Sequence, residues 1–248
     1  MIPRKSNRKR ASWEICAWTD LRLTAMKILV LSDVHADFAA LQRVFQVAPP
    51  HDAVLCLGDI VGYGSRPNEC CDLLRERGAR CLLGNHDAAA LGDPIIERFK
   101  ASAQLSARWT ARNLSPDNRA FLASLSPRVW FEDWGFEAVH GSLDLPIEGY
   151  VQGRYSAQQT FDLMRGDLCF FGHTHFAAQL ELLDVPGKRL EFGEHFWRDG
   201  GSFIVQNGGW KTLVNPGSVG QARDGSGRVR FACFDVETRQ VELFALAP

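Results

Sequence analysis

The chain contains 248 residues, of which 46% are hydrophobic and 23% are charged, a composition typical of a soluble globular protein with one large core. Positions 1–25 hold six Lys or Arg and two acidic residues, which leaves 22 basic and 27 acidic residues in the remainder. This acidic balance argues against general nucleic-acid binding by the main body of the chain.

No run of the sequence approaches the ~20 apolar residues that a membrane-spanning helix requires, so we expect no membrane partner. The seven cysteines are scattered and form no C-x-x-C pair. This spacing argues against a disulfide framework or a thiolate zinc site, and it suits the reducing cytoplasm. Composition leaves the oligomeric state open.

The basic segment 1–25 lacks the apolar stretch of a signal peptide, and Met26 stands immediately before the first clear strand. We therefore expect residues 1–25 to be a disordered or non-native extension, and residues 26–248 to form one domain. Attachment of the basic segment to an anionic surface is the alternative.

Short apolar runs alternate with amphipathic stretches in the first half of the chain, which is typical of strand–helix–strand units. The pattern predicts strands over 27–31, 53–57 and 80–83, with helices after Asp37 and over 68–77. Residues 94–125 are predicted to be helical and could form a cap beside a site. In that segment we expect Phe99, Leu105 and Trp109 to face the core.

Two strands, a helix and a further strand are predicted next, over 128–131, 136–139, 156–165 and 168–171. The last third is predicted to be mostly strands, over 179–183, 189–192, 202–206, 211–214, 229–235 and 241–246. Together the elements predict an α/β fold whose two halves are two sheets of one domain, packed face to face.

Five apolar runs are each followed by polar side chains of the kind that bind metal ions. These side chains are Asp33 and His35, Asp59, the triplet Asn85, His86 and Asp87, then His140, and finally His173 and His175. Five of the seven histidines occupy these strand ends. Because sites form beyond the carboxyl ends of strands in such sheets, we expect the five ends to meet in one crevice.

Carboxylate and imidazole ligands without thiolate suit Mn, Fe, Zn, Ni or Co. The set is larger than one ion needs, and two ions about 3.5–4 Å apart are a recurring arrangement for phosphoryl displacement. Each short motif alone also has a structural explanation, such as a turn or a helix N-cap. For the site to be absent, all of these structural explanations would have to be correct at once. The combination of motifs therefore favours a metal site.

The motifs, in this order, resemble those of the calcineurin-like metallophosphoesterases over nearly the whole chain. They are Asp33-Val34-His35, Gly58-Asp59, Gly84-Asn85-His86-Asp87, His140-Gly141 and Gly172-His173-Thr174-His175. Asn215-Pro216-Gly217-Ser218-Val219-Gly220 also resembles the short, single-domain bacterial and archaeal phosphodiesterase branch. The resemblance implies a four-layer αββα sandwich of two mixed β-sheets flanked by helices.

The resemblance also implies roles for individual residues. It places Asp33, His35 and His175 on one divalent ion, and Asn85, His140 and His173 on the other, with Asp59 bridging the two ions. Mn is the expected metal, with Fe, Ni, Co or Zn as alternatives. His86 would protonate the leaving oxygen after attack by a hydroxide shared by the ions, and Asp87 would orient His86.

The expected substrate is a small phosphodiester. The alternatives are a phosphomonoesterase, including a protein phosphatase or a dinucleoside polyphosphate hydrolase, and a non-catalytic scaffold of the same fold. The presence of His86 argues against the scaffold. Arg66 and Arg223 lie on predicted loops near the site and could bind substrate phosphate, although solvated surface positions are the alternative. The Asn215–Gly220 segment is expected to shape the floor of the crevice.

Overall fold

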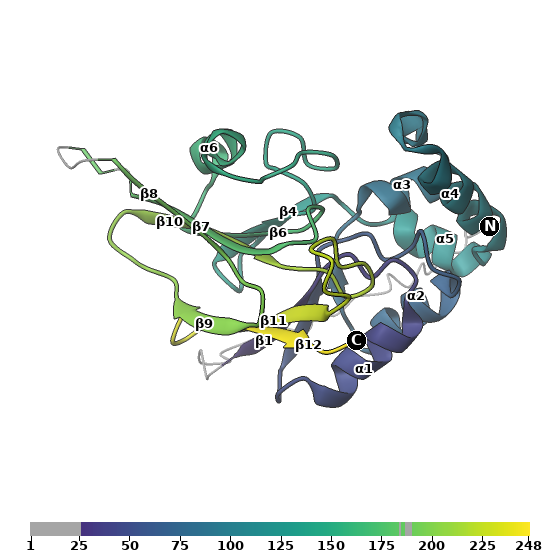
Figure 1. Cartoon of the computed structure of the whole chain (residues 1–248), viewed down its shortest axis with the longest axis horizontal. Helices are drawn as coiled ribbons and strands as arrows, with labels where there is room; N and C mark the ends of the chain where they lie inside the picture. The colour runs from purple at the N-terminus through teal and green to yellow at the C-terminus, as the bar shows by residue number, and fades with distance from the viewer. Residues whose placement is uncertain (1–25, 184, 187–189) are drawn as a thin grey trace, which may run out of the picture.

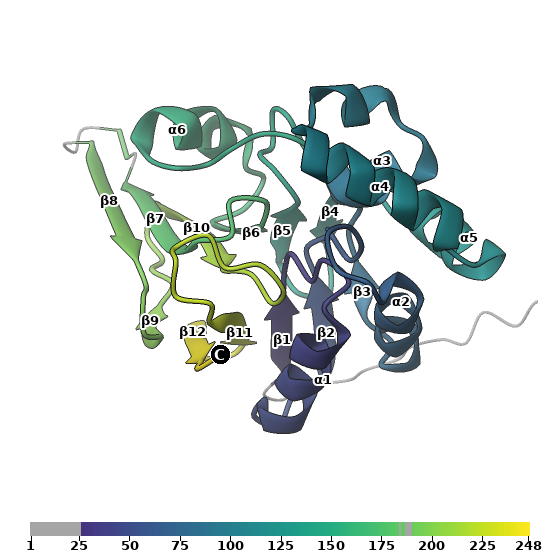
Figure 2. The ribbon, with the colours of Figure 1, turned by 45° about the vertical axis from the view of Figure 1, so that its right-hand side comes forward.

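The computed structural model describes residues 26–183, 185–186 and 190–248. The predictions for residues 1–25 therefore lie outside the described residues. Within the described part the chain folds into two six-stranded mixed sheets with helices on their outer faces. Figures 1 and 2 show the two sheets lying one on the other.

The first sheet has the strand order β3-β2-β1-β11-β12-β9. Its strands are β1 (Lys27–Leu31), β2 (Ala53–Cys56), β3 (Arg80–Cys81), β9 (Gly201–Ile204), β11 (Val229–Asp235) and β12 (Gln240–Leu246). Strands β1, β2 and β3 are parallel, whereas β11 pairs antiparallel with β1. The first three strands therefore end at the same edge of the sheet.

The second sheet has the strand order β4-β5-β6-β10-β7-β8. Its strands are β4 (Arg128–Phe131), β5 (Phe136–Val139), β6 (Leu168–Phe171), β7 (Ala177–Leu183), β8 (Glu191–Phe196) and β10 (Trp210–Pro216). Strands β5 and β6 are parallel. The prediction of a strand over 189–192 misplaced β8, because most of its side chains are exposed at a sheet edge and leave no apolar pattern in the sequence.

Three apolar layers hold the sandwich together. Helices α1 (Phe38–Val47) and α2 (Pro67–Glu76) cover the outer face of the first sheet, and α6 (Arg154–Leu163) covers that of the second. Between the sheets lie the rings of Phe136, Phe170 and Phe234, which contact one another edge to face. The αββα architecture expected from the sequence is thus confirmed.

A helical cap stands at one end of the sandwich (Figure 2). It consists of α3 (Asn85–Leu91), the 3-10 helix η1 (Pro94–Arg98), α4 (Ala101–Asn113) and α5 (Pro116–Ala123). The expectation that Leu105 and Trp109 face the core is wrong, since their side chains are 70% and 43% exposed. The buried face of α4 instead carries small side chains, because Ala107 packs closely against Ala88 and Ala89 of α3.

No helix in the described ranges is long and apolar enough to cross a membrane. The six cysteines of these ranges are all free thiols.

The buried position of Phe170 and the exposed position of Leu105 predict mutational effects of very different size. Phe170→Ala should lower the free energy of unfolding by about 3–5 kcal/mol, because it opens a cavity between the sheets. Leu105→Ala, on the exposed side of α4, should change it by less than ~0.5 kcal/mol. Urea unfolding of both variants measures the difference, and equal losses would contradict the assigned core.

Candidate metal centre

The loops after β1, β2, β3, β5 and β6 meet at one edge of the sandwich, where each carries the polar residues singled out in the sequence. The parallel arrangement within each sheet brings the carboxyl ends together. The seven expected ligand residues are all buried there. Six of them, all except Asn85, supply ligand atoms that fall into two groups, each of which could hold a metal ion.

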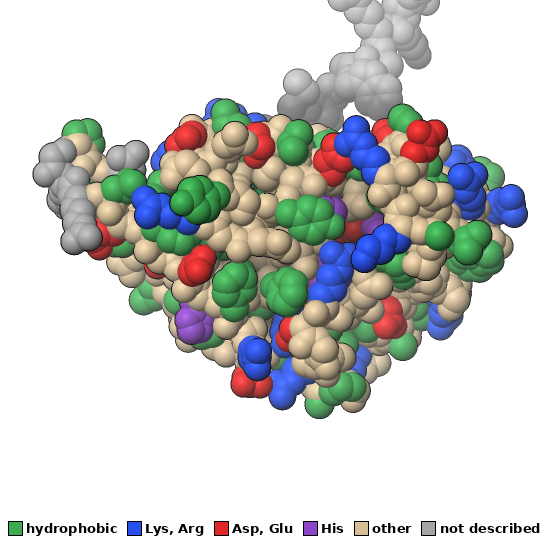
Figure 3. Space-filling view, turned by 45° about the horizontal axis from the view of Figure 1, so that its top comes forward, with side chains coloured by type: hydrophobic (Ala, Val, Ile, Leu, Met, Phe, Trp, Pro, Cys, Tyr) green, Lys and Arg blue, Asp and Glu red, His purple; other side chains and the backbone are tan. Residues whose placement is uncertain are grey.

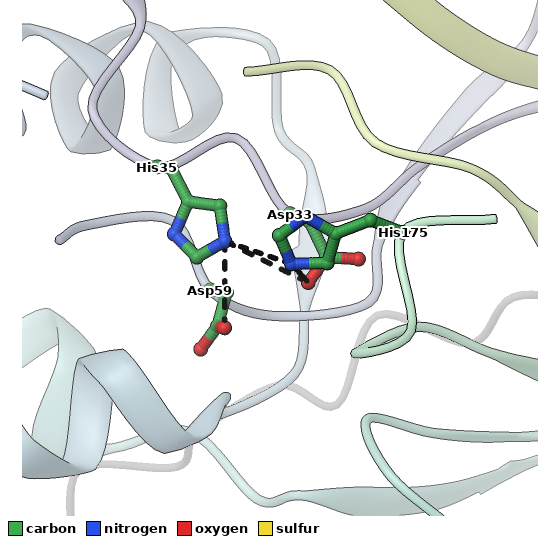
Figure 4. Close-up of side chains that lie close together, drawn as sticks. All are labelled: Asp33, His35, Asp59 and His175. Atoms are coloured by element: carbon green, nitrogen blue, oxygen red, sulfur yellow. Dashed lines mark hydrogen bonds and ion pairs between the residues drawn. The ribbon is translucent and has the colours of Figure 1, made fainter. Parts of the chain in front are cut away.

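The first group contains Asp33, His35, Asp59 and His175 (Figure 4). Nε2 of His35 lies 3.1 Å from Nε2 of His175, and Nε2 of His175 lies 3.2 Å from Oδ1 of Asp33. Oδ2 of Asp59 lies 3.7 Å from Nε2 of His35. These atoms point into one small space.

The second group contains Asp59, His140 and His173, with Asn85 beside them. Nε2 of His140 lies 3.6 Å from Oδ2 of Asp59 and 3.1 Å from Oδ1 of Asn85. The same oxygen of Asp59 thus serves both groups. Among the described residues, Asp59 is the only residue that belongs to both groups.

Hydrogen bonds to backbone carbonyls set the orientation of three imidazole rings. Nδ1 of His140 donates to Leu57 O at 2.8 Å, and Nδ1 of His175 donates to Gln221 O at 2.5 Å. Nδ1 of His35 makes a longer bond to a backbone carbonyl at 3.3 Å. Because the proton is held on Nδ1, the Nε2 lone pair of each ring faces the site, as a metal ligand requires.

This arrangement leaves acceptor atoms facing one another. The Nε2 lone pairs of His35 and His175 are directed together, and both ring nitrogens of buried His173 lack a hydrogen-bond partner within the part of the chain that the structure describes. Buried polar atoms without partners are costly. A cation in each group would satisfy them, so the residues present fit two divalent ions.

Burial and mutual repulsion dominate the electrostatics of the centre. Burial, together with the neighbouring carboxylates of Asp87 and Asp33, raises the pKa of Asp59 well above its usual value. Burial and the nearby His175 lower the pKa of His35, and burial and His140 lower the pKa of His173 to about 2. Neutral imidazoles retain the lone pairs that bind metal ions.

The backbone of the ligand loops is held in an unusual conformation. Asp33, His35, Asp59, His173 and His175 all have φ between 51° and 67°, the left-handed region that non-glycine residues rarely adopt. Such conformations persist only where the surrounding structure fixes them, and they concentrate at functional sites. The strain therefore marks these loops as a site independently of their side chains.

Hydrogen bonds from the Asn215–Gly220 segment help to hold the ligand loops in this conformation. Nδ2 of Asn215 donates to Gly172 O at 2.8 Å, and Oγ of Ser218 donates to Asp33 O at 2.9 Å. Gly220 N also donates to Asp33 O. One turn thus ties the loop after β1 to the loop after β6.

Gly84 allows the loop after β3 to approach Asp59. A Cβ atom at this position would lie 2.1 Å from Oδ1 of Asp59, a separation that no side chain can occupy. That oxygen accepts a hydrogen bond from His86 N at 2.8 Å. The carboxylate is therefore held through Oδ1 and presents Oδ2 to the two groups.

The His86 ring lies in the pocket beside the second group, between the rings of Tyr63 and Phe99 at centroid distances of 4.5 and 4.7 Å. Burial and the nearby His140 lower its pKa to about 3. Asp87 makes its hydrogen bonds to backbone, because its carboxylate accepts from Val61 N and Gly84 N, each at 3.0 Å. Asp87 thus acts on the loops around His86 rather than on its ring.

The two arginines expected near substrate lie in different places. Arg223 lines a pocket of about 640 Å³ that contains His86 and His173, and its NH1 group lies 3.4 Å from His173 O. Arg66 is half exposed, pairs with Glu69 at 2.9 Å and stacks on Phe38, and it is not part of this pocket. The structure brings only Arg223 to the site.

Several pocket residues were not singled out as site residues in the sequence. They come from the cap and from loops and comprise Tyr63, Arg98, Lys100, Glu148 and Tyr150. Nothing in their local sequence distinguishes them from ordinary surface residues. Figure 3 shows histidine side chains inside this hollow, flanked by basic and hydrophobic side chains.

The comparisons with known proteins agree with this geometry. The family model described as calcineurin-like phosphoesterase matches residues 26–177. The chain is 32% identical to the uncharacterized protein MJ0912 of Methanocaldococcus jannaschii over 219 residues, which is 87% of this chain and 85% of that protein. The chain belongs to the calcineurin-like phosphoesterase family, and this membership implies a phosphoester hydrolase.

Two solved structures share the fold. The crystal structure of a metallophosphoesterase from Sphaerobacter thermophilus is similar with a TM-score of 0.76 and 34% identity, covering 90% of this chain and 89% of that one. The hypothetical protein PH1004 from Pyrococcus horikoshii gives a TM-score of 0.66 at 18% identity, covering 90% and 88% of the two chains. At that identity PH1004 supports the fold alone.

The shared position of Asp59 predicts that its loss affects both ions. Asp59→Asn removes the one negative charge that the two groups share. We therefore expect the affinity for both ions to fall by about tenfold to a hundredfold, the range seen when a group that supports a metal ligand is lost. Calorimetric titration of metal-free protein with Mn²⁺, together with metal analysis of gently purified protein, measures the change. Asp162→Asn on the exposed face of α6 is the matched control. Loss of only one ion would contradict the shared position.

Proposed function

We propose that the protein is a dinuclear metal-dependent phosphodiesterase that acts on small substrates. The observation that carries the proposal is the position of Asp59, whose Oδ2 lies 3.7 Å from Nε2 of His35 and 3.6 Å from Nε2 of His140. A carboxylate oxygen between two imidazole groups is suited to hold two cations close together. The family membership supports the same chemistry.

The ligands we propose are those expected from the sequence: Asp33, His35, Asp59 and His175 for one ion, and Asp59, Asn85, His140 and His173 for the other. When bound, such ions activate water and neutralise charge on the phosphoryl oxygens. We expect Mn²⁺, because carboxylate, amide and imidazole groups suit it and thiolates are absent from the described ligand groups.

In this proposal His86 donates a proton to the leaving oxygen. His86 lines the pocket, where its ring can bond to a bound ester, while its Nδ1 is buried against Gly62. An anionic ester beside the ring favours the protonated form and opposes the effect of burial on its pKa. Asp87 would position His86 indirectly, through the backbone of Gly84 and Val61.

Arg223 is proposed to hold a non-bridging phosphoryl oxygen. Its guanidinium lies at the edge of the second ligand group, next to the carbonyl of His173. Guanidinium groups bind phosphate through charge-assisted hydrogen bonds. The pocket is also lined by residues of η1 and by Tyr150, and its volume of about 640 Å³ leaves room for the two ester groups of a phosphodiester.

Removal of the His86 imidazole should slow turnover without releasing metal. We expect His86→Ala to lower kcat by ~10²–10⁴, the usual contribution of general acid catalysis. The loss should be larger for a phenyl ester than for a p-nitrophenyl ester, because p-nitrophenolate leaves without a proton. Steady-state kinetics and metal analysis give both readouts. His195→Ala on β8 is the control, and unchanged kcat in His86→Ala would refute the role.

The preference for a diester or a monoester substrate is tested with two substrates that release the same leaving group, p-nitrophenolate. Bis(p-nitrophenyl) phosphate should be hydrolysed with a higher kcat/KM than p-nitrophenyl phosphate by the Mn²⁺-loaded protein. The comparison keeps the leaving group constant and changes only the second ester. Faster hydrolysis of the monoester would count against a phosphodiesterase.

A further inference from the structure

The segment 217–228, which connects β10 to β11, forms part of the pocket wall through Gln221 and Arg223. The beginning of this segment is fixed at the metal centre. Gln221 N accepts no freedom there, because it donates to Oγ of Ser218 at 2.8 Å, and Gln221 O accepts the hydrogen bond from Nδ1 of His175. The position of Arg223 therefore depends on what holds the chain on its other side.

An ion pair holds that other side. Residues 223–225 are exposed, but Oδ2 of Asp224 lies 2.6 Å from NH2 of Arg230, whose side chain is 3% exposed. The guanidinium of Arg230 also donates to Arg198 O at 2.8 Å and to Oγ of Ser226 at 3.3 Å. Charge-assisted hydrogen bonds of this kind fix geometry as well as adding energy. The exposed segment is thus tied to the interior of the protein through Asp224.

The stem of Arg230 lies against the beginning of the same segment. Gly217 has a φ of 85°, and a Cβ atom there would lie 2.7 Å from Cδ of Arg230. Arg230 N donates to Ser218 O at 2.9 Å. At the other end, Oδ1 of Asp224 accepts from the backbone N–H and the hydroxyl of Ser226, which closes the turn. One buried arginine therefore contacts the segment on both sides of the pocket residues.

Stability alone does not account for a buried arginine at this position. Removing a guanidinium group from water is costly, and replacement of a buried ion pair by apolar side chains is often neutral or stabilising. Neither Asp224 nor Arg230 lines the pocket, whereas Arg223, the neighbour of Asp224 in the chain, does. An effect of the ion pair on the site would have to pass through Arg223.

We propose that Asp224 and Arg230 are positioning residues, whose ion pair keeps the guanidinium of Arg223 at the pocket to receive substrate phosphate. This inference rests on the proposed phosphodiesterase function, in which Arg223 holds a non-bridging phosphoryl oxygen. Without the ion pair the exposed segment loses its attachment to β11, and Arg223 spends less time at the pocket.

The first test is Arg230→Met, which keeps an unbranched apolar stem and removes the charge. We expect KM for bis(p-nitrophenyl) phosphate with the Mn²⁺-loaded protein to rise about tenfold, the effect of one charge-assisted hydrogen bond. The value of kcat should change little, because the contact acts on bound substrate and transition state alike. Arg228→Met, which removes a surface ion pair with Asp199, is the matched control and should leave KM unchanged. An unchanged KM in Arg230→Met would overturn the inference.

A double-mutant cycle separates positioning from a general structural effect. Arg223→Met should itself raise KM, and the addition of Arg230→Met should raise it no further, because residues that act through one another are not additive. A second rise in the Arg223→Met background would show that Arg230 acts elsewhere and would overturn the inference. Asp224→Ala removes the partner on the exposed segment and should repeat the pattern, which keeps the test decisive if Arg230→Met does not fold.

Binding of inorganic phosphate to the Mn²⁺-loaded protein gives a readout without turnover. By calorimetry Arg230→Met should weaken phosphate binding about tenfold in the wild-type background and should have no effect in the Arg223→Met background. That pattern in a protein that hydrolyses neither ester with any metal would reject the proposed function and support the positioning role. Hydrolysis of the diester with unchanged KM and unchanged phosphate affinity in Arg230→Met and Asp224→Ala would reject only the positioning role.

Discussion

The carboxylate of Asp59 is the constraint around which the site is built. It lies buried between two clusters of imidazole and carboxylate groups, and one of its oxygens is within 3.7 Å of a ring nitrogen in each cluster. Burial and two neighbouring carboxylates raise its pKa, so the ionised form needs nearby positive charge to be stable. Two divalent cations would provide that charge and would also satisfy the unpartnered ring nitrogens.

The fold maintains this arrangement at a cost in backbone conformation. Five of the seven proposed ligands adopt left-handed φ values, each of which costs on the order of 1–3 kcal/mol. Contacts made by both sheets together offset this free-energy cost. Hydrogen bonds from Asn215, Ser218 and Gly220 hold the loops after β1 and β6 in place, and packing of the two sheets fixes the distance between those loops. Neither sheet contains a complete ligand group.

The pocket joins this rigid centre to a helical cap. Its floor consists of the ligand loops, and its far wall consists of η1 and the start of α4. The ion pair between Arg98 and Glu148 links the cap to the loop after β5. The volume of about 640 Å³ suits a small molecule rather than a folded protein surface. The proposed function therefore assigns the chemistry to the ligand loops of the two sheets and the choice of substrate to the cap.

The sequence alone determined the layered α/β fold and the candidate ligands, because short apolar runs followed by Asp, Asn or His are local patterns. It could not place side chains whose position depends on the packing of other elements. Leu105 and Trp109 are exposed, since the small residues of α4 fit closer to α3. Arg223 reaches the pocket whereas Arg66 pairs with Glu69, although the sequence predicted both to lie on loops near the site. Only the tertiary structure decided these outcomes, because contacts between distant segments determine which surface a loop residue faces.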